Sequence, residues 1–319
     1  MNYDIIGDVH GQADQLEALL RRMGYSVRAG AWRKAGHMAV FVGDLIDRGP
    51  GQLRTLELVR SMVEAGSALA TMGNHEYNAI GWATLEPPIT GRPLRTHSTD
   101  KQKDHQAFLN EVQPNSGIHR AWIEWFRTLP MWLELPGLRV VHACWDEASI
   151  DLLRKVCGPG NVLTERLLID SHTKGNSEHK AIESVLKGRE VDLPYGKSFP
   201  DKTNMQRTSV RVRWWHTGSN RLGDLALGID EDALRNVAHL QVDPGKIPGY
   251  DHPAPVFFGH YWMTGTPQPQ TPKVACVDYS AGNGGALTAY RWEGESTLRA
   301  SSFVSSHKAG DRPWLNYPG

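Results

Sequence analysis

Hydrophobic and polar positions alternate in three similar units over residues 1–80. Short apolar runs at residues 3–6 and 38–42 are each followed by apolar residues at helical spacing, over 13–23 and 53–63. A third apolar run covers residues 68–72. Strands that alternate with helices predict βαβ units and a largely parallel sheet.

Each of the three apolar runs ends at a glycine followed by a polar residue: Gly7-Asp8, Gly43-Asp44 and Gly73-Asn74. In open α/β sheets, ligands collect outside the carboxyl ends of the strands. We therefore expect the polar side chains after these runs to gather at one edge of the sheet. They are Asp8, His10, Asp44, Asp47, Arg48, Asn74 and His75.

The rest of the chain is less regular. Residues 86–115 are rich in Pro, Thr, Arg and Lys and predict a loop or insertion. Residues 146–251 predict polar loops with one amphipathic helix near 180–186, and the tail from Ser301 is expected to be surface-bound or loose. Other apolar runs predict a helix over 121–129 and strands over 131–135, 138–141, 256–258, 274–278 and 286–292.

Composition narrows the class of protein. The chain has 319 residues, of which 40% are hydrophobic, and this is typical of a globular protein. Lys+Arg and Asp+Glu both number 35, so no basic excess predicts strong nucleic-acid binding. No apolar run is long enough for a membrane helix, and the N-terminus lacks a cationic leader. With three widely spaced cysteines expected as free thiols, we expect a cytoplasmic protein.

The polar residues at the predicted strand ends suit metal binding. Carboxylate, imidazole and carboxamide groups are ligands for hard and borderline divalent metals. Two such metals about 3.5–4 Å apart can share one carboxylate, clamp a phosphoryl group and acidify a bridging water. Six candidate ligands lie at predicted strand ends: Asp8, His10, Asp44, Asn74, His142 and His260.

Three ordered motifs carry a family resemblance. They are Asp8-x-His10, Gly43-Asp44-x-x-Asp47-Arg48-Gly49 and Gly73-Asn74-His75-Glu76, followed by single histidines at His142 and Gly259-His260. Together they resemble the calcineurin-like metallophosphoesterase superfamily. The Asp-Arg-Gly motif resembles its phosphoprotein phosphatase branch, which also contains bacterial diadenosine tetraphosphatases. The resemblance implies an α/β fold, a four-layer αββα sandwich with mixed sheets, as one domain over 1–319 with a cap or lid inserted around 146–251.

The same resemblance implies two divalent metal ions, with manganese favoured and iron or zinc also compatible. One ion would be held by Asp8, His10 and Asp44. The other would be held by Asp44, Asn74, His142 and His260, so that Asp44 bridges the two.

The implied reaction is in-line attack of a metal-bridging hydroxide on phosphorus, without a phosphoenzyme. His75 would protonate the leaving oxygen, with Asp47 holding its ring, and Arg48 would bind phosphate oxygens. The family has a second phosphate-binding arginine between the last two metal histidines. Arg211 or Arg213 is the candidate, because alternation places both on one face of a strand.

Two positions depart from family patterns. Trp262 stands where other branches have a second histidine, which favours the phosphoprotein phosphatase-like arrangement, and Cys144 stands where the family usually has glycine. We expect Cys144 to be a buried free thiol near the metals rather than a nucleophile. The remaining histidines, His105 and His119 among them, are interpreted as surface or core residues.

The substrate stays open between two hydrolase functions. One is a phosphomonoesterase or phosphoprotein phosphatase. Glu76 favours this function, because Gly-Asn-His-Glu resembles the phosphoprotein phosphatase-like branch. The other is a hydrolase of phosphoanhydrides such as a dinucleoside polyphosphate or a capped RNA end. A lid over 146–251 that selects small nucleotides would favour this function. A third hypothesis, a metal-binding scaffold without turnover, would predict a lost ligand or general acid, yet Asp44, Asn74 and His75 are all present.

Overall fold

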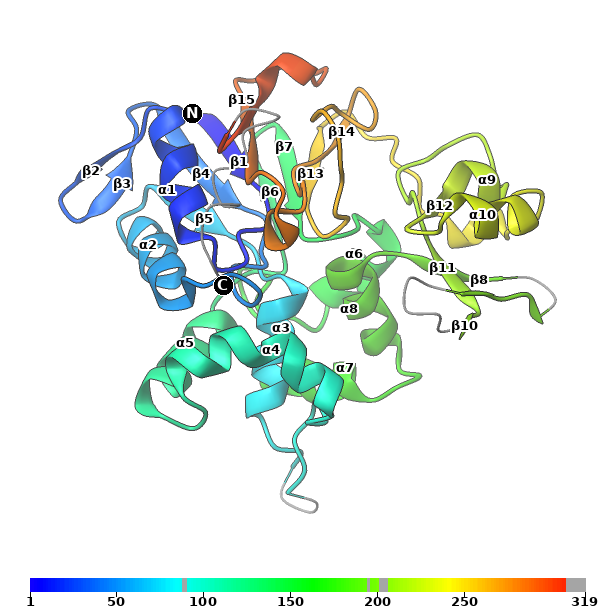
Figure 1. Ribbon diagram of the computed structural model, residues 1–319, viewed down its shortest axis with the longest axis horizontal. Helices are drawn as coiled ribbons and strands as arrows, with labels where there is room; N and C mark the ends of the chain where they lie inside the picture. The colour runs from blue at the N-terminus through cyan, green and yellow to red at the C-terminus, as the bar shows by residue number, and fades with distance from the viewer. Residues whose placement is uncertain (88–90, 194–195, 201–205, 308–319) are drawn as a thin grey trace.

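Two mixed β-sheets pack face to face at the centre of the molecule (Figure 1). The computed structural model describes residues 1–87, 91–193, 196–200 and 206–307. The first sheet has the order β16-β15-β1-β4-β5 and the second the order β14-β13-β7-β6. Their strands are β1 (Asn2–Ile6), β4 (His37–Phe41), β5 (Ala68–Ala70), β6 (Trp132–Leu135), β7 (Leu138–Val141), β13 (Val256–Phe258), β14 (Val274–Cys276), β15 (Thr288–Trp292) and β16 (Phe303–Ser305).

The strands that precede the polar motifs are parallel neighbours. In the first sheet Ile6 pairs with Phe41, and Phe41 pairs with Ala70, so β1, β4 and β5 end side by side. In the second sheet β13 runs parallel to both β14 and β7, while β6 and β7 form the predicted hairpin. The carboxyl ends of three strands in each sheet therefore lie at a common edge, as the apolar runs predicted.

Alternate residues of each strand fill the space between the sheets. Ile5 and Val40 from the first sheet meet Val140 and Phe257 from the second in one apolar cluster. The intervening residues, such as Ile6 and Phe258, belong to a larger cluster on the outer faces. Helices α1 (Ala13–Arg22) and α2 (Gln52–Glu64) cover the first sheet, and α6 (Glu147–Arg154) and α8 (Ser177–Lys187) contribute to the cluster beside the second. This arrangement confirms the expected αββα sandwich.

The prediction of a loop over 86–115 was wrong for its second half. Residues Thr99–Val112 form α4, which buries Phe108, Leu109 and Val112. The apolar positions lie only in its last two turns, so the polar composition of the first turns concealed the helix. Helices α3 (Asn74–Ala83), α4 and α5 (Gly117–Arg127) stand beside the edge where the strands end (Figure 1).

Residues 146–251 contain more regular structure than the one predicted helix. Helices α6, α7 (Glu165–His172) and α8 join the larger apolar cluster. A small sheet with the order β12-β11-β8 and helices α9 and α10 form a separate cluster at the right of Figure 1. The elements there are β8 (Glu190–Asp192), β9 (Phe199–Pro200), β10 (Gln206–Arg207), β11 (Ser209–Val212), α9 (Leu222–Leu225), β12 (Ala226–Leu227) and α10 (Glu231–Val237).

Two short elements complete the fold. A hairpin of β2 (Ser26–Arg28) and β3 (Ala31–Arg33) follows α1. The tail from Ser301, expected to be surface-bound or loose, adds β16 as an edge strand of the first sheet. The part of it beyond residue 307 lies outside the described residues. Among the described helices, none combines the length and apolar character that crossing a membrane requires.

Removing one ring from the space between the sheets should destabilise the fold strongly. Phe257 is fully buried and its ring centre lies 5.0 Å from that of Tyr290. We expect Phe257→Ala to lower the free energy of unfolding by about 3–5 kcal/mol. Urea denaturation measures this, with Val27→Ala on the exposed hairpin as a control that should change it by less than about 0.5 kcal/mol. An equal effect of the two substitutions would contradict the packing described here.

Candidate active site

The polar residues at the strand ends lie on an unusual backbone. Non-glycine residues with positive φ cluster there, including His10 (48°), Asp44 (50°), Asp47 (69°) and His260 (69°). Such conformations are sparsely populated and persist only where the surrounding structure imposes them. Gly43 has φ 102°, and a Cβ atom there would collide with the backbone of Gly73. The three loops are therefore packed too closely for side chains at the glycines of the motifs.

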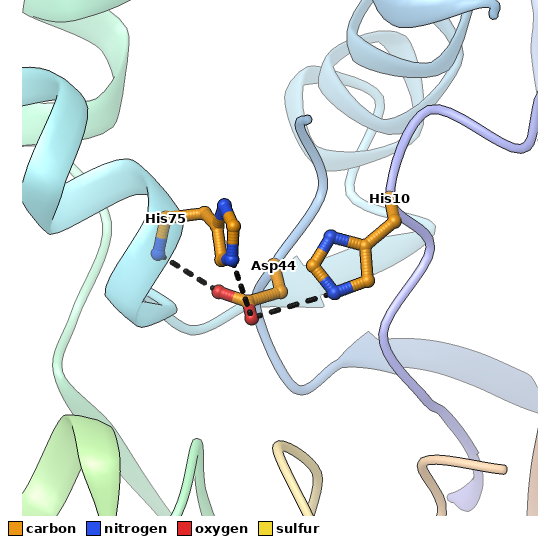
Figure 2. Close-up of side chains that lie close together, drawn as sticks. All are labelled: His10, Asp44 and His75. Carbon is orange, nitrogen blue, oxygen red and sulfur yellow. Dashed lines mark hydrogen bonds and ion pairs between the residues drawn. The ribbon is translucent and has the colours of Figure 1, made fainter. Parts of the chain in front are cut away.

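The Asp44 carboxylate is the centre of the site. Its Oδ2 atom lies 3.6 Å from Nε2 of His10 and 3.9 Å from Nε2 of His75, and its Oδ1 accepts a hydrogen bond from the backbone N–H of His75 at 2.9 Å. Figure 2 shows the two rings on either side of this carboxylate. The neighbouring histidines outweigh burial, which acts in the opposite direction, and hold the pKa of Asp44 well below its usual value.

A second group lies on the other oxygen of Asp44. Nε2 of His142 is 3.4 Å from Asp44 Oδ1 and 3.0 Å from Oδ1 of Asn74. His260 completes this group, since its ring nitrogen lies within 4.8 Å of the ligand atoms of Asp44 and His142. Asp44 thus stands between a group containing His10 and a group containing His142 and His260.

Three buried atoms in this centre have no hydrogen-bond partner among the described residues: Asp8 Oδ1, His10 Nε2 and His260 Nε2. The other oxygen of Asp8 accepts the backbone N–H of His260 at 2.9 Å. Burial, with the negative charges of Asp278 and Asp44, raises the pKa of Asp8 well above its usual value. Unpartnered nitrogen and oxygen donors beside excess buried negative charge fit divalent cations. The residues present therefore fit the metal ions that the family resemblance implies.

Glu76 holds the loops around the centre together. Its Oε2 accepts the N–H groups of Asp44 and Gly73, both at 2.9 Å, and its Oε1 accepts those of Leu45 and Ile46 at 2.8 and 3.3 Å. Burial and the charge of Asp44 raise the pKa of Glu76 to about 7, against these hydrogen bonds. Glu76 therefore fixes the backbone of Asp44 relative to helix α3.

Asp47 lies between two histidines. Its Oδ2 is 2.5 Å from Nδ1 of His75, and its Oδ1 is 2.9 Å from Nδ1 of His105. Burial raises its pKa, but the hydrogen bonds from His105 and His75 outweigh burial and lower it to about 2. Burial lowers the pKa of His75, but the charges of Asp44 and Asp47 outweigh burial and raise it to about 9. His75 is therefore protonated at neutral pH, with Nε2 directed towards Asp44.

A cavity of about 320 Å³ opens beside these residues and is lined by basic groups. Arg48 lies in it with its guanidinium 4.3 Å from the ring centre of Trp262, and Arg211 lies in it 5.4 Å from the ring centre of Tyr261. Arg213 does not line this cavity: it follows the end of β11 and donates to the carbonyl oxygen of Asp224 at 2.8 Å. The alternation expected for Arg211 and Arg213 stops where that strand ends.

Four residues of the site were not predicted from the sequence: Glu76 as a backbone acceptor, Arg95 in the lining of the cavity, His105 beside Asp47, and Asp278 beside Asp8. Asp278 follows the apolar run at 274–277 and could have been found by the rule that selected Asp44. His105 and Arg95 lie in the stretch interpreted as a loop, where no strand end marks them. Cys144 is fully buried, and burial raises the pKa of its thiol well above its usual value, which agrees with the expected unreactive thiol.

The geometry matches the sequence pattern of a known family. The model of the calcineurin-like phosphoesterases matches residues 1–220 of the 319. This chain belongs to the calcineurin-like phosphoesterase family. The resemblance carried by the three motifs is thereby confirmed, and the edge of the sheets described above is the candidate active site of a calcineurin-like phosphoesterase.

Two similar proteins carry the name bis(5'-nucleosyl)-tetraphosphatase, and one similar structure is that of a serine/threonine phosphatase. The asymmetrical bis(5'-nucleosyl)-tetraphosphatase PrpE of Bacillus subtilis is 40% identical over 146 residues, which are 45% of this chain and 57% of that protein. The symmetrical bis(5'-nucleosyl)-tetraphosphatase of Methylobacillus flagellatus is 26% identical over 307 residues, 92% of this chain and 93% of that protein. A serine/threonine phosphatase structure from Saccharomyces cerevisiae is 14% identical, with TM-score 0.49 and coverage of 98% and 81%. This chain spans about half the length of the PrpE protein it matches.

Replacing one acceptor oxygen of Glu76 should loosen the site. Glu76→Gln replaces one acceptor oxygen by an NH2 group, which cannot accept the backbone N–H groups that it faces. We expect a loss of about 2–4 kcal/mol in the free energy of unfolding, because each unsatisfied buried donor costs about 1–3 kcal/mol. Thermal or urea denaturation measures this, and Glu57→Gln on the exposed face of α2 is the control. Wild-type stability in Glu76→Gln would refute the bracing role.

Proposed function

We propose that this chain is a two-metal phosphohydrolase that acts on phosphate monoesters. The observation that carries the proposal is the position of Asp44, whose two carboxylate oxygens face separate sets of potential ligands. The ligands proposed for one ion are Asp8, His10 and Asp44, and those for the other are Asp44, Asn74, His142 and His260. Manganese is the proposed ion, with iron or zinc as alternatives. When bound, the ions would polarise the phosphoryl group and make a water molecule more acidic.

The side chains of this chain supply the remaining chemistry. Protonated His75 is proposed as the general acid that gives its Nε2 proton to the leaving oxygen, while Asp47 holds the ring through Nδ1. Arg48 and Arg211, which line the cavity, are proposed to bind phosphate oxygens. The contact of Arg48 with Trp262 orients its guanidinium towards the cavity.

The proposal predicts metal-dependent hydrolysis of p-nitrophenyl phosphate that requires Asp44. We expect chelation to abolish turnover, added manganese to restore it, and Asp44→Ala to lose both turnover and manganese binding measured by calorimetry. His75→Ala should retain manganese binding and lose about 10²–10⁴-fold in kcat on an ester with a poor leaving group. Manganese-independent turnover would contradict the two-metal proposal. Unchanged turnover of the ester with the poor leaving group in His75→Ala would contradict the general-acid role alone.

A second cavity favours phosphoanhydrides as the alternative substrate class. It has a volume of about 790 Å³ and shares Asn74, Asn78, Arg95, Arg211 and His260 with the first, so the two form one continuous cleft. Its cationic side chains outnumber its acidic ones, and Lys187 and Arg189 are among them. A chain of phosphates that begins at the metal centre could extend along these cations. The tetraphosphatase names of the relatives support the same alternative.

The small sheet of residues 190–227 is proposed as part of a lid that selects the substrate. Strand β11 brings Arg211 to both cavities, while β8 contributes Glu190 and Asp192 to the second. The proposed lid thus begins with β8, since α6–α8 pack in the main apolar cluster.

The two substrate classes can be separated by a paired assay. If phosphoanhydrides are the substrate, diadenosine tetraphosphate should be hydrolysed with a higher kcat/KM than a phosphopeptide. Lys187→Met combined with Arg189→Met should then raise its KM about tenfold or more, since bonds from charged groups contribute about 1.5–3 kcal/mol each. KM for p-nitrophenyl phosphate should change less than about threefold, and exposed Lys155→Met serves as control. Preference for the phosphopeptide, with no effect of the pair, would favour phosphoprotein hydrolysis.

A further inference from the structure

His105 contacts the candidate active site from helix α4, outside the three motifs. Its side chain is 7% exposed, and its Nδ1 lies 2.9 Å from the Oδ1 atom of Asp47. The same ring also lines the first cavity. A buried imidazole needs a hydrogen-bond partner, but many groups could serve as that partner. The partner of His105 is the carboxylate of Asp47, which also holds the ring of His75.

The direction of both bonds to Asp47 follows from its charge. A carboxylate with a pKa of about 2 is ionised at neutral pH and only accepts hydrogen bonds. Both His75 and His105 must therefore carry a proton on Nδ1 and donate it, one to each oxygen. Because each oxygen of Asp47 accepts one hydrogen bond, two bonds rather than one fix the orientation of its carboxylate plane.

Helix α4 is itself well anchored against this loop. The ring of His105 lies 5.7 Å from that of Trp82 on helix α3, measured between ring centres. Further along α4, Glu111 accepts the backbone N–H groups of Gln52 and Leu53 at 2.8 and 2.9 Å. These residues begin α2, which starts four positions after Arg48. Helix α4 therefore contacts the chain at Asp47 and again at the start of α2, which follows the Asp-Arg-Gly segment.

We propose that His105 is a positioning residue, which orients Asp47 so that its second oxygen directs the ring of His75 towards the leaving group. In the step concerned, the attacking hydroxide oxygen forms a bond to phosphorus, the bond between phosphorus and the leaving oxygen breaks, and the Nε2 proton of His75 passes to that leaving oxygen. His105 touches no reacting atom and acts only through Asp47. The inference rests on the proposed hydrolase function and extends it to a residue beyond the motifs.

The test uses the dependence of the rate on the leaving group. A good leaving group such as p-nitrophenolate departs without a proton, whereas phenolate needs one from the general acid. We expect His105→Ala to lower kcat for phenyl phosphate at least tenfold and kcat for p-nitrophenyl phosphate less than about threefold, with KM unchanged. His105→Asn, which keeps a donor at the same place, should restore at least a third of the lost kcat.

His119 provides the matched control. It is a buried histidine that packs on Phe108, with ring centres 5.9 Å apart, but it makes no contact with Asp47. His119→Ala should affect stability and leave the ratio of the two rates unchanged. The double variant His75→Ala/His105→Ala should be no slower than His75→Ala, because both residues act through one proton transfer.

A second readout does not depend on activity. Proton NMR of the metal-free protein should show downfield Nδ1–H signals for both histidines bonded to Asp47. His105→Ala should remove one signal and shift the other, and Asp47→Asn should shift both. Equal loss on the two esters, additive loss in the double variant, or an unshifted His75 signal would each overturn the positioning role. Absence of turnover in the wild type would instead overturn the proposed function, and the NMR result would still decide whether His105 orients Asp47.

Discussion

The burial of Asp44 at the edge where the strands of the two sheets end is the constraint on which the site depends. A carboxylate removed from water needs compensating groups around it. The carboxylate of Asp44 accepts a hydrogen bond from the backbone N–H of His75 and lies near the rings of His10 and His142. The backbone of Asp44 itself has a left-handed conformation. Three further buried carboxyl groups, Asp8, Glu76 and Asp278, lie near it, and burial together with the charge of Asp44 raises the pKa of each. Divalent ions would supply positive charge beside these carboxyl groups. The same ions would then both stabilise the buried carboxylates and take part in the proposed chemistry.

The same constraint accounts for the dense hydrogen bonding and close packing of the surrounding loops. Glu76 ties the backbone of Asp44 to helix α3, and Gly43 lets the two loops approach without side chains between them. Asp47 is held in turn by His75 and His105. Proton transfer and phosphate binding both need side chains fixed to within fractions of an ångström, and these bonds provide that order before substrate arrives.

Much of this could be predicted from the sequence because the information is local. The apolar runs of β1, β4, β7 and β13 have nearly the predicted bounds, since a buried strand requires consecutive apolar residues that turn residues interrupt. The placement of Asp8, Asp44 and Asn74 followed from the rule that parallel strands present their carboxyl ends together. Helix α4 was missed because its apolar positions occupy only its final turns, and with it His105 and Arg95 were missed.

The sequence by itself determined the family and the residues that could bind metal, because their order and spacing recur only when the chemistry requires them. Only the tertiary structure decided which residues act together across long separations. It brought His105 to Asp47, directed Arg211 but not Arg213 into the cavity, and gave Glu76 its four backbone partners. The reason is physical. Hydrogen-bond partners outside regular elements depend on which distant parts of the chain the fold brings together, and the periodicity of the sequence does not indicate which parts these are.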